Sequence, residues 1–306
     1  MEFRQVIYNV LSKLMKENPN IVVLDADLAK PNGTFPLYQE FPDRCYNVGI
    51  AEGNMMALAA GLSSYGFIPC CFTFAPFATR RACDQIAVSL AYAKQRAIIF
   101  GTDPGMSAET NGGTHMAFED MSVLRAIPKV LIYDVVDFVQ LEQALPKLIN
   151  YDGVVYIRVP RKTFPQVFDE TYKFTLTKAD VIKEGKDLTI IASGIMVSIV
   201  KDIMDDLKEK GIEAELISLN TVKPLDEETI LKSVSKTRKC VVVENHSIIG
   251  GAYGAVAEIL SKKCPTLTLP IGINDEFGQT GKYKELLEAY KLDQQSVLEK
   301  IIDFMK

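Results

Sequence analysis

Apolar residues near the start of the chain follow two different spacings. Between Phe3 and Asn18 they recur at the spacing of one helix face, which predicts an amphipathic helix. The next apolar run, from Ile21 to Asp25, is short and continuous, as is typical of a buried strand. A second helix is expected over 52–64, because these residues are rich in Ala, Met and Leu and Tyr65-Gly66 after them is typical of a helix C-terminus.

The alternation of strands and helices continues through the first half of the chain. We expect strands at 46–50, 69–74, 97–101, 130–133 and 154–159, and helices at 77–94, 121–126 and 140–148. Strands that alternate with helices indicate a parallel sheet with helices on both faces. Residues 1–170 are therefore predicted to form a doubly wound, mainly parallel-sheet α/β domain.

The pattern becomes mixed and polar at 171–186, and we place a linker there. Beyond it we expect strands at 188–192, 214–217, 240–243 and 267–269, and helices at 197–210, 227–234 and 254–262. A chain of 306 residues is long enough for two domains. Residues 187–306 are therefore predicted to form a second, smaller α/β domain.

Composition and charge narrow the classes of partner. Hydrophobic residues make up 48% of the chain and charged residues 24%, which argues against a disordered or fibrous protein. The net charge is −5 and no basic run with interleaved aromatic residues is present, so we expect no binding to nucleic acid. No apolar stretch is long enough to span a bilayer and no signal peptide opens the sequence, so we predict a cytoplasmic protein without a membrane partner.

Cysteine and histidine leave few positions for metal or imidazole chemistry. The six cysteines form no CxxC pair, so we expect buried reduced thiols and no metal site in this chain. Only two histidines occur, His115 and His246. His115 follows the flexible turn 111–114, which can aim a side chain into a cleft. His246 lies in the second domain and is predicted to be structural.

Charged and aromatic side chains follow three of the predicted strands. Glu52 stands between a strand and a helix, either at the sheet edge where ligands bind or as a charge that favours the helix N-terminus. Phe74 and Phe77 flank a strand-to-helix loop and suit a flat heteroaromatic ring, with core packing as the alternative. Arg158 and Arg161 lie at a strand end, where a guanidinium clamps a phosphate or forms a surface salt bridge.

The order and spacing of these residues resemble the second half of transketolase over nearly the whole chain. The matching segments are Asp25-Ala26-Asp27-Leu28, Asn47-Val48-Gly49-Ile50-Ala51-Glu52-Gly53-Asn54-Met55, Phe74 with Phe77, Gly113-Thr114-His115, Leu124-Arg125-Ala126-Ile127-Pro128, Arg158, Glu244-Asn245-His246-Ser247-Ile248-Ile249-Gly250-Gly251 and Gly278-Gln279-Thr280-Gly281.

The resemblance implies that the chain binds thiamine diphosphate and transfers a two-carbon ketol unit from a ketose to an aldose. Glu52 matches the glutamate that hydrogen-bonds N1′ of the aminopyrimidine and so promotes loss of the thiazolium C2 proton, which makes it the expected catalytic acid/base. Phe74 and Phe77 match walls of the pyrimidine pocket. We also assign Asp27 to cofactor binding.

The resemblance also implies which side chains contact the sugar. His115 would hydrogen-bond oxygens at the reacting carbons, as a catalytic and substrate-binding residue, and Arg158 would hold the distal phosphate. At two further sugar-contact positions the family has His and Asp, whereas this chain has Asp103 and Asn111. Arg80 stands where a Tyr is usual and adds a cation near the site. We infer a ketose or acceptor outside the ordinary pentose phosphates, such as a branched, deoxy or sulfonated sugar.

A motif that the family needs is missing from this chain. The diphosphate and its Mg²⁺ are held in the family by a Gly-Asp-Gly motif and a downstream Asn, and neither is found here. The resemblance therefore implies a separate N-terminal subunit that carries the diphosphate and metal motif. We expect an α2β2 assembly with active sites at the subunit interface.

Three alternative functions stay open at this point. The β subunit of a 2-oxoacid dehydrogenase E1 component shares the pyrimidine domain and its glutamate, but the segments 114–115 and 124–128 favour transketolase. A 1-deoxyxylulose-5-phosphate synthase-like enzyme shares Thr114-His115 and a segment like Arg158 to Arg161, but it is normally one long chain. A binding or regulatory module without catalysis is the third alternative, and the presence of Glu52, Phe77 and His115 together argues against it.

Overall fold

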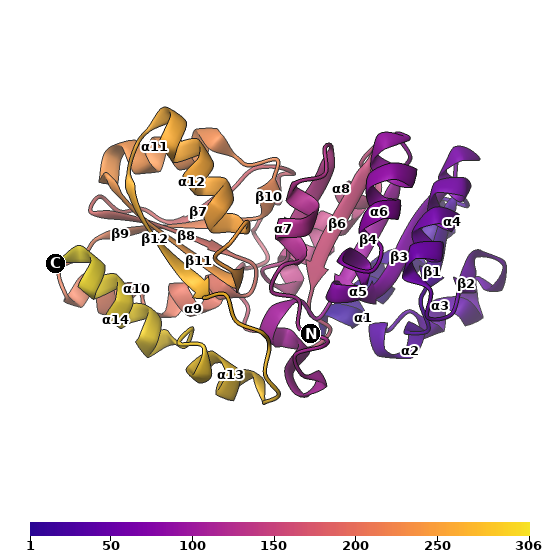
Figure 1. The fold of residues 1–306 in the computed structure, drawn as a ribbon, viewed down its shortest axis with the longest axis horizontal. Coiled ribbons are helices and arrows are strands. Elements are labelled where there is room, and N and C mark those ends of the chain that lie inside the picture. Colours follow the sequence, from indigo (N-terminus) through magenta and orange to yellow (C-terminus); the bar gives the residue numbers. More distant parts are fainter.

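The computed structural model describes residues 1–306, and it contains two separate sheets that lie side by side (Figure 1). The helices and strands of the first half are α1 (Phe3–Glu17), β1 (Ile21–Asp25), α2 (Ala29–Asn32), α3 (Phe35–Glu40), β2 (Cys45–Asn47), α4 (Glu52–Ser64), β3 (Ile68–Phe74), α5 (Ala75–Thr79), α6 (Cys83–Gln85), β4 (Ala97–Thr102), α7 (Asp120–Arg125), β5 (Val130–Asp134), α8 (Phe138–Ile149) and β6 (Val154–Val159). Two 3-10 helices, η1 (Pro42–Arg44) and η3 (Gly105–Asn111), and one π-helix, η2 (Ile86–Tyr92), complete this half.

The second half of the chain repeats the alternation of strands and helices. Its elements are β7 (Asp180–Lys183), β8 (Leu188–Ser193), α9 (Met196–Asp202), α10 (Met204–Glu209), β9 (Ala214–Leu219), β10 (Thr221–Lys223), α11 (Glu227–Thr237), β11 (Lys239–Ser247), α12 (Ala252–Lys263), β12 (Leu267–Ile273), α13 (Tyr283–Ala289) and α14 (Gln294–Met305).

Both sheets are mainly parallel, which confirms the predicted fold class. The first has seven strands in the order β10-β5-β6-β4-β3-β1-β2, and only β10 runs antiparallel to its neighbour. The second has five strands in the order β12-β11-β8-β9-β7, and only β7 is antiparallel. Every residue of β1, β3, β4, β5 and β6 is buried, as expected for strands with helices on both faces.

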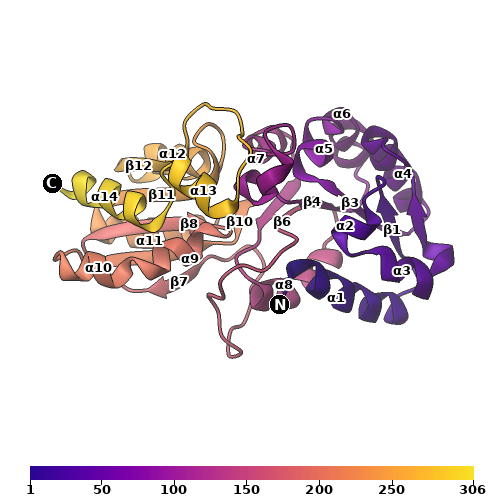
Figure 2. The same ribbon diagram turned by 90° about the horizontal axis from the view of Figure 1, so that it is seen from below.

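Helices cover both faces of each sheet. Figure 2 shows α1 and α8 on one face of the first sheet and α4 with α5 on the other. In the second half, α11 and α12 pack on one face of the sheet, and α9 and α14 pack on the other. The apolar residues of the first pair belong to one hydrophobic cluster and those of the second pair to another. Because its strands other than β10 are parallel, the first sheet has all their carboxyl ends on one side, which is called the carboxyl edge below.

The structure differs from the sequence pattern in one predicted helix and in the predicted linker. The helix expected at 77–94 is divided into α5, α6 and η2. Its buried residues Ala78, Ala82, Ile86 and Leu90 recur at every fourth position, so the apolar pattern continues across the breaks and conceals them. The linker expected at 171–186 contains β7, which pairs with β9, so its last part belongs to the second sheet.

The two halves also share a sheet, which the sequence pattern does not indicate. β10 comes from the second half but pairs with β5 at the edge of the first sheet, with Thr221 opposite Tyr133. Gln140 of α8 supports this connection because its side-chain amide donates to the Asn220 side chain at 2.9 Å. The two α/β units are therefore joined by a shared strand as well as by the chain.

Asp25 at the end of β1 makes stability depend on pH. Its carboxylate is completely buried and accepts hydrogen bonds from Thr34 Oγ1 and Tyr38 OH at 2.8 and 3.2 Å. Burial raises the pKa of Asp25 from 3.8 to about 6. The folded protein therefore binds more protons than the unfolded chain between pH ~4 and ~6, so this group stabilises the fold at low pH and the contribution is lost as pH rises through ~6.

Replacing Asp25 by Asn is expected to remove this contribution. In the wild type, we expect the free energy of unfolding to fall by an amount on the order of 2–3 kcal/mol between pH ~4 and ~6. This fall should be absent in Asp25→Asn. Urea unfolding across this range measures the difference, with Asp43→Asn at an exposed position as the control. Equal pH dependence in the wild type and Asp25→Asn would contradict the prediction.

Candidate functional site

Several of the predicted site residues lie at the carboxyl edge of the first sheet. Glu52 begins α4 just after β2, Phe74 ends β3, Asp103 follows β4, and Arg161 lies just beyond the end of β6. Ligands of open parallel α/β sheets bind at this edge, because the loops that follow the strands form a crevice there. The topology therefore brings residues that are distant in sequence to one side of the domain.

Glu52 is buried although it is charged. Its side chain is 1% exposed, and its Oε2 accepts a hydrogen bond from Arg81 Nη1 at 2.8 Å. The other oxygen, Oε1, lies 3.3 Å from Thr73 Oγ1 in β3. A carboxylate out of contact with water needs such partners, because an unpaired buried charge is strongly destabilising. A charge that only favours a helix N-terminus can remain exposed to water, so the burial and pairing of Glu52 point to a further role.

Three aromatic rings form a cluster that is connected to Glu52 through Arg81. The rings of Phe74 and Phe77 have centroids 6.2 Å apart, and His115 lies 5.5 Å from Phe74 and 5.2 Å from Phe77, all in edge-to-face geometry. Phe74 is buried, whereas Phe77 and His115 remain partly exposed. Aromatic side chains such as these also pack against flat heteroaromatic ligands. Glu52 and the aromatic cluster are linked because the Arg81 guanidinium lies 4.1 Å from the Phe77 centroid.

Asp103 and Arg161 form an ion pair on the other side of the aromatic cluster. Arg161 Nε donates to Asp103 Oδ2 at 2.6 Å, and the Arg161 backbone N–H donates to Oδ1 at 2.9 Å. Burial raises the pKa of Asp103, although the Arg161 guanidinium opposes this shift. The guanidinium also lies 4.8 Å from the Phe74 centroid. Arg161 is thus the arginine of this strand end that touches the aromatic cluster.

Arg158 lies in a buried ion-pair network, which argues against the predicted contact with a substrate phosphate. Its side chain is 1% exposed, and it donates from Nε to Asp120 Oδ2 at 2.7 Å and from Nη1 to Asp134 Oδ2 at 3.0 Å. Its Nη2 donates to the Asn245 carbonyl at 3.0 Å. Burial alone would raise the pKa of Asp120, but the Arg158 guanidinium lowers it below its usual value. Arg158 therefore joins the two halves of the molecule from within.

The remaining predicted residues have other immediate partners. Arg80 Nε pairs with Glu119 Oε1 at 2.8 Å. Asp27 accepts a hydrogen bond from Asn47 Nδ2 at 3.0 Å and is exposed. Asn111 is exposed at the end of η3, in the loop that leads to His115.

The loop that carries Asn111 and His115 is supported by the second half of the chain. A side chain on Gly113 would lie only 2.2 Å from the Gly278 carbonyl oxygen, and one on Gly112 would lie 2.7 Å from Thr280 Oγ1. Glycine at these positions allows the close approach of the two segments. The second domain thus packs against the loop that leads to His115.

Arg81 belongs to this site although the sequence motifs do not include it. It contacts both Glu52 and Phe77, whereas the sequence comparison points only to the neighbouring Arg80 as a cation near the site. The available signal is its spacing. Arg81 lies four positions after Phe77 in the helix predicted at 77–94, and residues at this spacing share a helix face.

His246, the other histidine, lies in β11 and makes no contact with the aromatic cluster. It is completely buried, with Nε2 3.7 Å from Asp120 Oδ1, and burial lowers its pKa to about 4. Its neighbour Glu244 accepts the backbone N–H groups of Ala252 and Tyr253, and burial raises its pKa to about 7. This burial agrees with the prediction that His246 is structural.

Two other kinds of feature do not occur in the structure. No group of three or more His, Cys, Asp or Glu side chains is arranged to hold a metal ion. None of the helices combines the length and the apolar character that crossing a bilayer requires.

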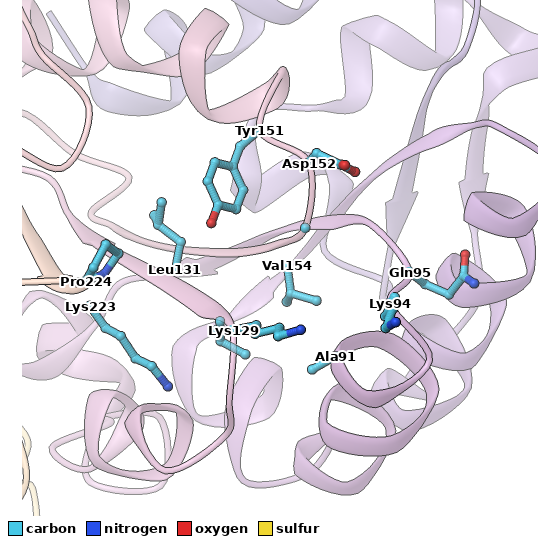
Figure 3. A pocket seen from close by; sticks show the side chains of 12 residues that line it. Ala91, Lys94, Gln95, Lys129, Leu131, Tyr151, Asp152, Val154, Lys223 and Pro224 are labelled. Atoms are coloured by element: carbon cyan, nitrogen blue, oxygen red, sulfur yellow. The ribbon is translucent and has the colours of Figure 1, made fainter.

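A cleft of about 490 Å³ lies at the opposite edge of the first sheet (Figure 3). Lys94, Lys129 and Lys223 line it together with Tyr151 and Asp152, beside the amino ends of β4, β5 and β6. Lys223 is already engaged, since its Nζ donates to the Arg125 carbonyl at 2.8 Å. Because none of the predicted site residues lines this cleft, the candidate site remains at the carboxyl edge.

Comparison with known protein families matches both halves of the chain. Residues 1–166 match the pyrimidine binding domain of transketolase, and residues 177–297 match the transketolase C-terminal domain. The 6-deoxy-6-sulfo-D-fructose transketolase subunit SqwH of Clostridium sp. (strain MSTE9) is 41% identical over 96% of this chain and 92% of that protein. An apulose-4-phosphate transketolase subunit of Phocaeicola vulgatus is 32% identical over 99% of this chain and 97% of that protein.

Solved structures and longer relatives agree with these matches. A split gene transketolase, described as an inactive beta4 tetramer, is 38% identical with a TM-score of 0.89, over 99% of this chain and 97% of that chain. Transketolase from Campylobacter jejuni shares the fold at 23% identity and a TM-score of 0.82, but this chain covers only 46% of it. The 1-deoxy-D-xylulose-5-phosphate synthase of Heliobacterium modesticaldum is 32% identical and is likewise covered to 46%. The chain therefore belongs to the transketolase family, with the length and the two domains of its split C-terminal subunits.

Proposed function

We propose that the chain is the C-terminal subunit of a thiamine-diphosphate-dependent transketolase that transfers a two-carbon ketol unit from an anionic ketose to an aldose. The observation that carries the proposal is the buried Glu52 carboxylate, which Arg81 links to the cluster of the Phe74, Phe77 and His115 rings. A buried carboxylate connected to an aromatic cluster suits a ring nitrogen of a flat heterocycle. The family membership and the split-subunit relatives support the same reaction class.

The residues at this edge fit the aminopyrimidine end of thiamine diphosphate. Glu52 would hold a proton at the ring nitrogen, Phe74 and Phe77 would enclose the ring, and Asp27 would contribute from the adjacent strand end. When bound, the cofactor supplies a stabilised carbanion for carbon–carbon bond cleavage and formation. As the family resemblance implies, His115 would hydrogen-bond the oxygens of the donor at the reacting carbons, and its ring lies against both Phe rings.

The diphosphate and its Mg²⁺ are assigned to another chain. We propose that an N-terminal subunit with the diphosphate and metal motif docks at the carboxyl edge, in an α2β2 assembly that completes each site. The split relatives support such a partner. The cytoplasmic location expected from the sequence stays a prediction.

The substrate is proposed to be an anionic sugar other than an ordinary pentose phosphate. Arg161 replaces Arg158 as the residue that would hold the distal anion, since it lies at the strand end and its Nη1 makes no hydrogen bond within the chain. Asp103, Asn111 and Arg80 are the positions expected to adapt the site to a non-standard sugar. Two of the relatives are named for a sulfonated hexose and a branched pentose phosphate, which supports this proposal.

Reconstitution with the N-terminal subunit tests the function. We expect ketol transfer only with both subunits, thiamine diphosphate and Mg²⁺ present, and a preference for sulfonated or branched donors in a substrate panel. Equal or better turnover of xylulose 5-phosphate with ribose 5-phosphate would contradict the substrate proposal. Turnover of a 2-oxoacid donor instead of ketoses would contradict the reaction class and favour the E1 or 1-deoxyxylulose-5-phosphate synthase alternatives. No turnover with any donor would favour the non-catalytic module.

Loss of the Arg161 side chain is expected to weaken binding of the anionic donor. Arg161→Leu should raise KM by roughly 10- to 100-fold with a smaller effect on kcat, because a charged hydrogen bond to the substrate is removed. Steady-state kinetics with an anionic ketose measure this change. A donor without the anionic group serves as the control, since its KM should change little. An unchanged KM for the anionic donor would exclude Arg161 as its binding residue.

A further inference from the structure

Arg81 occupies a position that neither the sequence motifs nor the proposed function assigns. It lies in the turn between α5 and α6, and its side chain remains 44% exposed while its guanidinium contacts the buried Glu52. The neighbouring Arg80 turns away to Glu119. Both arginines lie in the turn that follows α5, but they pair with different carboxylates.

The contacts of Arg81 restrict the Glu52 carboxylate on one side. Nη1 donates to Oε2 at 2.8 Å, and the guanidinium is held in turn over the Phe77 ring, 4.1 Å from its centroid. The planar guanidinium is suited to both contacts, because it hydrogen-bonds in its plane and stacks through its face. Oε1, by contrast, has only the long 3.3 Å contact with Thr73 Oγ1. The two carboxylate oxygens are therefore unequal.

We infer that Arg81 is a positioning residue that fixes Glu52 Oε2 and thereby presents Oε1 to the cofactor's ring nitrogen. The inference rests on the proposed function and adds a residue to it. Arg81 also supplies the opposite charge that offsets the burial of Glu52. Because the guanidinium lies on the Phe77 ring, the same residue sets the position of the carboxylate relative to the aromatic cluster.

Substitution of Arg81 in the two-subunit holoenzyme tests this inference. The readouts are the exchange rate of the cofactor's C2 proton, followed by NMR after quenching, and cofactor affinity, measured by calorimetry. We expect Arg81→Ala to slow C2 exchange by roughly 10- to 100-fold, because small misplacements of a reacting group have effects of this size. KM for the sugar should change little. Arg81→Lys, which keeps the charge but not the planar fork, should recover only part of the exchange rate.

A double substitution separates positioning from general damage. If Arg81 acts through Glu52, then Arg81→Ala should cause no further loss of exchange in a Glu52→Gln background. Arg44→Ala is the matched control, because Arg44 also stacks on a phenylalanine, 4.6 Å from the Phe41 centroid, and has no carboxylate partner. We expect its exchange rate to equal that of the wild type.

The outcomes distinguish this inference from the proposed function. Slow exchange in Glu52→Gln together with wild-type exchange in Arg81→Ala would overturn the role of Arg81 and leave the proposed function intact. Wild-type exchange in both variants would overturn the proposed function as well. Equal loss in Arg81→Ala and Arg44→Ala, or further loss in the double variant, would show a general structural effect and overturn the inference.

Discussion

Glu52→Gln is expected to lower kcat of the two-subunit enzyme by roughly 10²- to 10⁴-fold, the range for loss of a general acid or base. The amide fills the same space at the start of α4 but does not hold and release a proton as the carboxyl group does. The fold should be retained, because an amide oxygen can still accept hydrogen bonds from Arg81 and Thr73 and the Arg81 side chain, 44% exposed, remains hydrated. Steady-state kinetics at saturating thiamine diphosphate measure the effect.

A second glutamate provides the matched control for this substitution. Glu40 at the end of α3 also accepts hydrogen bonds from side chains, including Ser12 Oγ at 2.7 Å, but it lies outside the proposed site. Glu40→Gln should therefore keep full activity. Full activity of Glu52→Gln in the same assay would exclude its assignment as the acid/base.

Arg158→Met is expected to destabilise the chain by about 3–5 kcal/mol, the usual result of breaking a buried charge pair. The substitution leaves the buried carboxylates of Asp120 and Asp134 without their shared cation and removes the link to the Asn245 carbonyl. Urea unfolding of the isolated chain measures the change in free energy. Arg158→Lys keeps the charge without the fork of donors and should lie between Met and the wild type.

The control for Arg158 is an arginine in an exposed ion pair. Arg4 pairs with Glu2 at 2.6 Å, and both side chains are about two-fifths exposed. Arg4→Met should change stability by less than about 1 kcal/mol. If Arg158→Met were as stable as the wild type and only raised KM for the donor, the assignment of Arg158 to the substrate anion would be correct after all.

The sequence pattern predicts most of the strands of the first sheet but not the pairing of its outermost strand, β10. Short apolar strands alternating with helices specify a parallel doubly wound sheet, and the strands β1, β5 and β6 lie where they are expected. The pairing of β10 with β5 is not foreseen, because Thr221–Lys223 is too short to show a period and its partner is distant in sequence. Local pattern identifies strands, whereas the pairing of distant strands depends on the tertiary packing.

Motifs locate the candidate site more reliably than they assign its individual side chains. Glu52, Phe74, Phe77 and His115 are recognisable through spacing, and the fold brings the three rings together. The burial of Arg158 is not foreseen, because the sequence shows a charge near a strand end but not the direction of its side chain. An arginine inside a strand that has helices on both faces is enclosed, whereas one beyond the strand end is free to reach a ligand.

The shared strand β10 constrains how the chain is made. During translation, β1 to β6 emerge first, but the edge of β5 has no partner until Lys223 has left the ribosome. An unpaired edge strand is a site for association with other chains. The nascent N-terminal half therefore carries an open sheet edge while residues 160–223 are synthesised, and chaperone contact is expected in that interval.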